Sequence, residues 1–161
     1  MKNNNLYKGE INVSTELDEF LRSCFLNHLV IYNYFLEVLN KNPEFSYKVL
    51  KEKCFEYIVE KNITQYLGSP LFNELYYLFK KFKKNNKSAK ALTDIHYITF
   101  FVTGYNNKNF SKDGNLIILK DAPGAITLLE ELPEIDYTKG MIYFNISYSN
   151  NESKYRLSIY Q

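Results

Sequence analysis

The chain has 161 residues, the size of one typical domain, and 45% of them are hydrophobic, so it can bury a substantial core. Its net charge of +2, from 20 Lys and Arg against 18 Asp and Glu, is too small for a protein that neutralises nucleic acid over its whole surface. Only Arg22 and Arg156 are arginines, so bidentate recognition of guanine edges has few donors and any basic surface must be local.

The N-terminal sequence MKNNNLYKGE lacks the apolar segment of a secretory signal, and no stretch approaches the ~18 apolar residues of a membrane span. We therefore expect a cytoplasmic protein with no membrane partner. Cys24 and Cys54 both fall in predicted helices and are expected to be reduced, buried thiols.

The first predicted elements are a strand and a long helix. Residues 7–13 alternate apolar and polar side chains, as a half-buried strand does. The helix is predicted for Thr15–Lys41, capped by Ser14 or Thr15, with Asp18 in its first turn. Its apolar residues run nearly all the way round, which predicts burial on nearly every side. The main stripe consists of Leu17, Leu21, Cys24, His28, Ile31 and Phe35.

Two further helices are predicted. The first begins at Ser46 and runs to about residue 61, with Phe45 and Leu50 placed as a hydrophobic staple. The second has Ser69 as its cap and Pro70 at its first helical position. Its apolar face contains Leu71, Leu75, Leu78, Phe79 and Phe82.

After residue 91 the hydrophobic period changes from helical to two. A strand is predicted for 95–105, and the dipeptide Asp113-Gly114 predicts a hairpin between 110–112 and 115–119. Pro123-Gly124 predicts a turn before a short strand at 125–129. An acidic loop at 130–137 and two strands, 141–149 and 155–160, complete the chain.

This order predicts an α+β fold: an N-terminal strand, a three-helix insertion, and then a small antiparallel β-barrel or sheet. We expect one compact unit over 1–161. Within it, a helical lobe at 14–91 is inserted into a β subdomain formed by 5–13 and 92–161.

A run of lysines closes the third predicted helix, which also carries two tyrosines. Lysines in a stripe with neighbouring aromatic rings are typical of contact with phosphates and bases. The alternative is a solvated helix end, where lysines complement the helix dipole. A smaller basic face, Lys48 and Lys51 with Lys53 near Tyr47, is predicted on the second helix. The candidate nucleic-acid contacts are Tyr76, Tyr77, Lys80, Lys81, Lys83, Lys84, Lys87, Lys90, Lys48 and Lys51.

Other polar groups indicate weaker possibilities. The acidic loop could hold a divalent ion, imitate a phosphate backbone toward a protein partner, or be simply solvated. Its candidate protein contacts are Glu130, Glu131, Glu134 and Asp136.

Cys24 and His28 have the spacing of two metal ligands, but nothing completes a ligand set, so we expect them in the core; His96 is expected to be structural. No catalytic triad, P-loop or glycine-rich phosphate cradle is present, so we expect no enzyme activity, cofactor or metal.

Several segments, in order along the chain, resemble the N-terminal half of TnpB transposon nucleases, which are related to compact type V CRISPR effectors. The matching segments are 29–37 (LVIYNYFLE), 71–84 (LFNELYYLFKKFKK), 110–119 (FSKDGNLIIL), 122–126 (APGAI) and 140–159 (GMIYFNISYSNNESKYRLSI).

The resemblance implies that the helices correspond to a recognition domain and the strands to a wedge domain, which together hold a guide RNA and help to read a short DNA motif. The RuvC-like nuclease and zinc ribbon of that family have no counterpart in this sequence. The chain also has acidic residues where the family usually has basic ones after the glycine turn. The leading interpretation is a non-catalytic module that binds structured RNA or DNA. The alternatives are a phage or mobile-element protein that imitates part of a type V effector, as an anti-CRISPR inhibitor would, and a decaying transposase fragment.

Overall fold

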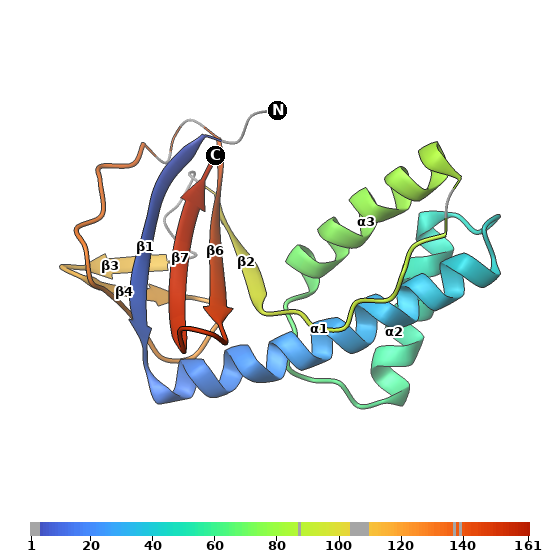
Figure 1. Ribbon diagram of the computed structural model, residues 1–161, viewed down its shortest axis with the longest axis horizontal. Helices are drawn as coiled ribbons and strands as arrows, with labels where there is room; N and C mark the ends of the chain where they lie inside the picture. Colours follow the sequence, from blue (N-terminus) through green and yellow to red (C-terminus); the bar gives the residue numbers. More distant parts are fainter. Residues whose placement is uncertain (1–3, 87, 104–109, 137, 139) are drawn as a thin grey trace. The chain divides into compact units, whose positions relative to one another are not determined.

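The computed structural model describes residues 4–86, 88–103, 110–136, 138 and 140–161, without the side chains of 101–103 and 110 (Figure 1). The chain divides into two compact units. The β unit consists of Met1–Arg22 and His96–Gln161, and the helical unit consists of Ser23–Ile95. The division falls within α1 (Thr15–Lys41), so the first turns of this helix belong to the β unit.

Within the described residues, the β unit is built on one antiparallel seven-stranded sheet in the order β2-β6-β7-β1-β5-β4-β3. The sheet curls so that β3 and β4 run across the direction of β1, β6 and β7, and its edges stay unpaired (Figure 1). It is therefore an open half-barrel. Its strands are β1 (Asn5–Val13), β2 (Tyr97–Thr103), β3 (Phe110–Asp113), β4 (Leu116–Leu119), β5 (Ile126–Leu128), β6 (Met141–Ser149) and β7 (Lys154–Tyr160).

The predicted α+β fold is confirmed, with the N-terminal strand returning to a sheet made by the C-terminal half. β1 pairs with β7, and Asn4 and Gln161 exchange backbone hydrogen bonds of 3.1 and 3.2 Å next to this pair. Every second side chain along a strand points into the core, as the buried Ile142, Phe144 and Ile146 of β6 do. No helix in the described part of the chain has both the length and the apolar character needed to cross a membrane.

The hairpin between β3 and β4 differs from the prediction by one residue. Asp113 pairs with Leu116, so the two loop residues are Gly114 and Asn115 rather than Asp113 and Gly114. The reason is backbone conformation: Gly114 has a φ of +57°, and a primed hairpin turn needs positive φ at its first loop position. The strand predicted for 95–105 is observed as β2, and residues 104 and 105 lie outside the described residues.

The start of α1 is fixed within the β unit. Ser14 is the cap, because its Oγ accepts hydrogen bonds from the backbone N–H groups of Leu17 (3.4 Å) and Ala125 (3.0 Å). Asp18 accepts a 2.7 Å hydrogen bond from the hydroxyl of Tyr155 and pairs with the Arg22 guanidinium at 3.0 Å. Burial favours the neutral acid, but these two hydrogen bonds lower the pKa of Asp18.

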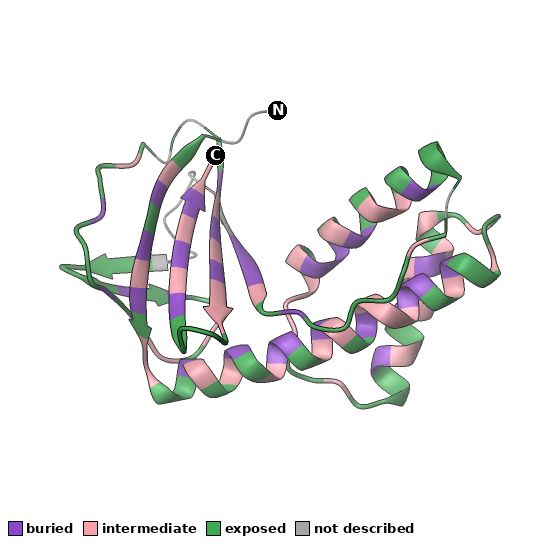
Figure 2. Cartoon of the chain, viewed as in Figure 1, coloured by how far each residue is buried: buried purple, intermediate pink, exposed green. Residues whose placement is uncertain are grey.

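The helical unit contains the rest of α1 with α2 (Tyr47–Glu60) and α3 (Gly68–Asn85). Ser46 caps α2 as predicted, since its Oγ accepts from the N–H of Val49 at 3.3 Å. One apolar cluster joins the three helices, and its buried members are Ile31, Phe35, Leu36, Leu39, Leu50, Cys54, Ile58, Leu71, Phe72, Leu75 and Phe82 (Figure 2).

The predicted start of α3 is wrong. Leu67, not Ser69, is the capping residue: it is extended (φ −103°, ψ 99°), and its N–H donates to Nε2 of His28 at 2.9 Å. Gly68 and Ser69 are therefore already helical, and Pro70 occupies the third helical position. Proline is tolerated there because the first four N–H groups of a helix have no intrahelical partner.

The expectation that α1 is buried on nearly every side is also wrong. The predicted stripe from Leu17 to Phe35 is buried, but Leu26 is 67% exposed and Val30 is 42% exposed. The apolar content of a helix does not determine how many partners cover it, and here one face of α1 is left open (Figure 2).

Candidate nucleic-acid interface

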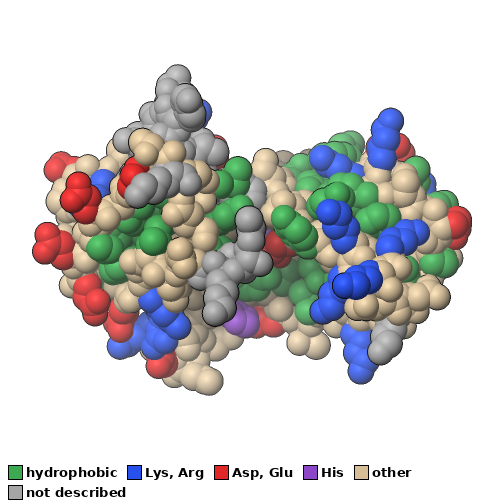
Figure 3. Space-filling view, turned by 90° about the horizontal axis from the view of Figure 1, so that it is seen from above, with side chains coloured by type: hydrophobic (Ala, Val, Ile, Leu, Met, Phe, Trp, Pro, Cys, Tyr) green, Lys and Arg blue, Asp and Glu red, His purple; other side chains and the backbone are tan. Residues whose placement is uncertain are grey.

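One surface of the helical unit combines lysines with aromatic rings from α2 and α3. On α3 the positions 72, 76, 79, 80 and 83 recur at three- and four-residue spacing and therefore share a side of the helix. Lysines lie among hydrophobic side chains on this unit, in the right-hand half of Figure 3. We define the lysine–aromatic face as Tyr47, Lys51, Phe55, Phe72, Tyr76, Phe79, Lys80 and Lys83.

Three lysines of this face lie over aromatic rings. The distances from Nζ to the ring centroid are 4.7 Å for Lys80 over Tyr76, 5.2 Å for Lys83 over Phe79, and 5.3 and 5.7 Å for Lys51 over Phe72 and Phe55. Such contacts contribute about 0.5–1 kcal/mol each at exposed sites. They hold the ammonium groups near the surface of the rings. Lys83 also donates to the backbone carbonyl of Pro43.

Tyr47 anchors the aromatic part of the face. Its hydroxyl donates a 2.6 Å hydrogen bond to the backbone carbonyl of Phe72, which ties α2 to α3. Its ring meets Tyr76 edge-on at 5.1 Å and Phe79 at 5.9 Å. Burial is the main cause that raises the pKa of Tyr47 to about 12, and the nearby Cys54 and Tyr76 add to it. This hydroxyl therefore remains a donor at neutral pH.

A second stripe of α3 is more open to solvent. Tyr77, Lys81 and Lys84 follow one another at helical spacing, and all three are exposed. Tyr77 is 62% exposed, compared with 37% for Tyr76, so it offers the larger ring surface to a stacking partner. The structure therefore brings both predicted tyrosines and all four lysines of α3 onto two adjacent stripes.

The remaining predicted basic residues lie around these stripes. Lys48 is exposed on α2 one turn before Lys51, and Lys53 forms an ion pair of 3.8 Å with Glu56. Lys90 is exposed in the segment that follows α3. Lys87 lies outside the described residues.

The acidic loop belongs to the β unit and has no regular secondary structure over 131–136. Glu130, Glu131 and Glu134 are exposed, while Leu132 between them is buried. The carboxylate of Asp136 accepts a 3.0 Å hydrogen bond from the N–H of Thr138 and thus closes a local turn. In the described residues, no three His, Cys, Asp or Glu side chains cluster closely enough to hold a metal ion.

Cys24 and His28 are core residues, as predicted. Burial lowers the pKa of His28 to about 4 and raises that of Cys24 to about 12. The lone pair of His28 Nε2 accepts the N–H of Leu67, so it already has a structural role. His96 is exposed at the end of the segment that leads to β2.

The sequence interpretation missed two asparagines of α1 that organise the helical unit. Asn33 bonds the backbone of Leu92 twice, with Nδ2 to O at 2.9 Å and Oδ1 to N at 2.8 Å. Asn40 bonds the backbone of Ala89 in the same way, at 2.9 and 3.3 Å. These amides fix the segment after α3 along α1. Their seven-residue spacing on a largely apolar helix was the available signal.

The fold and this surface define an α+β protein that has a lysine- and aromatic-rich helical unit and an antiparallel half-barrel unit. In comparisons with known proteins, the chain matches no protein-family model and no curated protein sequence.

Proposed function

We propose that this chain is a non-catalytic nucleic-acid-binding module that contacts structured RNA or DNA through α3 and the adjoining part of α2. The observation that carries the proposal is the lysine–aromatic face, where Lys51, Lys80 and Lys83 are each held over a ring. An ammonium group has three N–H donors, so a lysine resting on a ring still has donors free for a phosphate.

Because lysines cover these aromatic rings, the face favours contact with the phosphate backbone of a nucleic acid over recognition of its bases. A ring that carries a lysine has less surface for stacking, and Tyr77 is the most exposed aromatic side chain of α3. Lysine provides a point charge rather than the bidentate geometry with which arginine reads guanine. We therefore expect strong dependence on salt and weak dependence on sequence.

We further propose that the module is a relative of the recognition and wedge parts of TnpB-like nucleases. The support is the ordered set of sequence motifs quoted above, together with the lysine run that ends one of them. On this proposal the natural ligand is a structured RNA or the DNA that it pairs with.

The test compares two double variants by fluorescence anisotropy with a labelled RNA hairpin and a DNA duplex. Lys80→Glu with Lys84→Glu changes one lysine of the lysine–aromatic face and one of the adjacent exposed stripe of α3. Lys112→Glu with Lys120→Glu changes exposed lysines of the β unit. Both take the net charge from +2 to −2, because each Lys→Glu change removes two charges.

The proposal expects the first variant to bind at least tenfold more weakly than the second at low salt, with the slope of log K against log salt reduced by about 2. Equal losses in the two variants would show only a general charge effect. Such a result would sink the proposed interface.

A protein-binding role is the second candidate, favoured by the exposed carboxylates of Glu130, Glu131 and Glu134 around the buried Leu132. On this alternative, the chain inhibits a type V effector or related nuclease by occupying a phosphate-binding surface. Adding purified protein to a cleavage reaction of such a nuclease tests it. Inhibition that disappears on Glu130→Lys with Glu131→Lys supports this role, and unimpaired cleavage contradicts it.

A further inference from the structure

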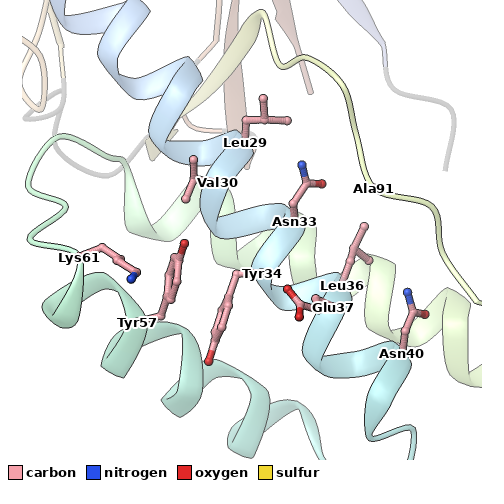
Figure 4. Close-up of a pocket in the computed structure, with 10 residues that line it drawn as sticks. All are labelled: Leu29, Val30, Asn33, Tyr34, Leu36, Glu37, Asn40, Tyr57, Lys61 and Ala91. Carbon is pink, nitrogen blue, oxygen red and sulfur yellow. The ribbon is translucent and has the colours of Figure 1, made fainter.

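A groove of about 780 Å³ runs over the outward side of α1 in the helical unit. α1 forms its floor, Tyr57 of α2 stands on one side, and Ala91 of the segment after α3 stands on the other (Figure 4). Its volume lies within the range of small-molecule sites. It is separate from the residues that define the lysine–aromatic face.

The walls of the groove are fixed. The segment containing Ala91 is held along α1 by the paired amide bonds of Asn33 to Leu92 and of Asn40 to Ala89. The other wall is a helix that packs on the common core. A ligand would therefore enter a preformed site at little conformational cost.

One side of the groove is aromatic. Tyr34 and Tyr57 stack with their centroids 4.0 Å apart and their planes within 9°. In Figure 4, Tyr34 lies between Tyr57 and Glu37, so its second face is turned away from Tyr57. Lys61 approaches the Tyr57 ring at 5.8 Å. The face of Tyr34 is thus the ring surface on which a planar ligand can stack.

The floor of the groove has a defined pattern of polar groups. Asn33, Glu37 and Asn40 follow one another at four- and three-residue spacing, which places a carboxylate between two amides. Each amide uses one N–H and its oxygen on the backbone of the wall, so a second Nδ2 hydrogen remains as a donor. Glu37 pairs with Lys41 at 2.6 Å, but both side chains are largely exposed, and such pairs are easily exchanged.

The groove thus offers a carboxylate as hydrogen-bond acceptor, an amide as donor next to it, and an aromatic ring for stacking. This combination matches the Watson–Crick edge of guanine. The Watson–Crick edge of guanine has two adjacent N–H donors, at N1 and N2, followed by the O6 acceptor. Adenine would instead turn the N1 lone pair toward the carboxylate. We propose that this groove binds the base of guanine, stacked on Tyr34, with Glu37 accepting from N1–H and N2–H and an asparagine amide donating to O6.

This inference goes beyond the proposed binding of nucleic-acid phosphates, and it concerns residues outside the lysine–aromatic face. The guanine can come from a free nucleotide or from an unpaired position in a strand. In both cases the recognised chemistry is the same, and it gives base selectivity to a chain with two arginines.

The experiment titrates the full chain with GMP, AMP and inosine monophosphate by calorimetry, and with the RNA pentamers UUGUU and UUAUU. Inosine monophosphate lacks the exocyclic amine and so loses one donor. Side-chain amide signals of Asn33 and Asn40 are followed by NMR. Glu37→Gln replaces the carboxylate at nearly constant size, and Glu52→Gln is the matched control on an exposed position of α2.

We expect guanine to bind at least tenfold more tightly than adenine in one or both formats, with inosine between them, and the two asparagine amides to shift. Glu37→Gln should bring guanine within about threefold of adenine, and Glu52→Gln should keep the preference. A preference for GMP assigns a nucleotide site, and a preference confined to the pentamers assigns an unpaired base in a strand. Equal binding of guanine and adenine in both formats, or a preference that survives Glu37→Gln, overturns the inference. Unchanged RNA binding in the Lys80 and Lys84 variant, with GMP selectivity intact, would count only against the lysine–aromatic face.

Discussion

Replacing His28 should remove a specific part of the acid sensitivity of this protein. His28 is 5% exposed in the helical unit, and its Nε2 accepts the N–H of Leu67 at 2.9 Å. Burial lowers its pKa to about 4 from an ordinary value of 6.5. Protonation of the folded protein would put a charge in the core and break this hydrogen bond.

The sign and size of the effect follow from these pKa values. Above pH 6.5 the imidazole of His28 is neutral in both states and costs nothing. As the pH falls below 6.5, His28 becomes protonated in the unfolded chain but stays neutral in the folded chain. The folded state therefore loses stability until about pH 4. At about 1.36 kcal/mol per pKa unit, the full loss is about 3 kcal/mol. About 2 kcal/mol of it occurs between pH 7 and pH 5.

The assay is urea unfolding of the wild type and of His28→Gln at several pH values from 7 to 4. His28→Gln should be less stable at pH 7, where it loses shape complementarity, but the difference from the wild type should shrink by about 2 kcal/mol by pH 5. His96→Gln, at an exposed position, is the matched replacement of the other histidine. Parallel curves for the wild type and His28→Gln over this range would refute the reasoning.

Four further changes test the fold. Gly124→Ala should cost more than about 2 kcal/mol, because φ is +76° and a Cβ there would collide with Ser14 and lie 3.1 Å from the Leu17 nitrogen. Gly114→Ala, at φ +57° with open space around it, should cost about 1 kcal/mol; equal losses by chemical denaturation would contradict this contrast. Asn33→Ala should cost about 1 kcal/mol and speed hydrogen exchange along the segment after α3, and unchanged exchange there would count against the amide clamp. Phe35→Ala, at a fully buried position, should cost about 3–5 kcal/mol in the same measurement, and a loss below 1 kcal/mol would show that the core can collapse around it.

The elements themselves were predictable where local patterns are strong. Alternation in β6 and β7 located both strands, because one face of each is buried and period two is the only pattern that fits. Ser46 marked the start of α2, because a hydroxyl one residue before the helix satisfies a backbone donor whatever the tertiary context.

The errors came from tertiary contacts that local patterns do not encode. Ser69 looked like a cap, but the bond from Leu67 to His28, 39 residues earlier in the chain, sets the start of α3. The apolar content of α1 predicted burial on nearly every side, but Leu26 and Val30 are exposed. The order of strands in the sheet was likewise not deducible, since pairing between distant strands depends on the whole set of partners.

The candidate site was predicted in part. The lysines and tyrosines of α3 were found from composition and spacing. Phe55 and Phe72, whose rings lie under Lys51, were not predicted from the sequence. Their contact depends on how α2 packs against α3. The groove over α1 was missed for a related reason: Asn33 and Asn40 acquire their role only when the segment after α3 returns along the helix.

The pairing of β1 with β7 has a consequence for biosynthesis. Glu10 and Lys154, which form an ion pair across these strands, are 144 residues apart in sequence. β1 therefore leaves the ribosome long before its partners β5 and β7 exist, while the contacts of the helical unit form within Ser23–Ile95. Closing so long a loop is slow, and β1 remains an unpaired, partly apolar edge in the meantime. Nascent chains stalled before β7 should accordingly protect the helical unit from protease and leave the β unit sensitive.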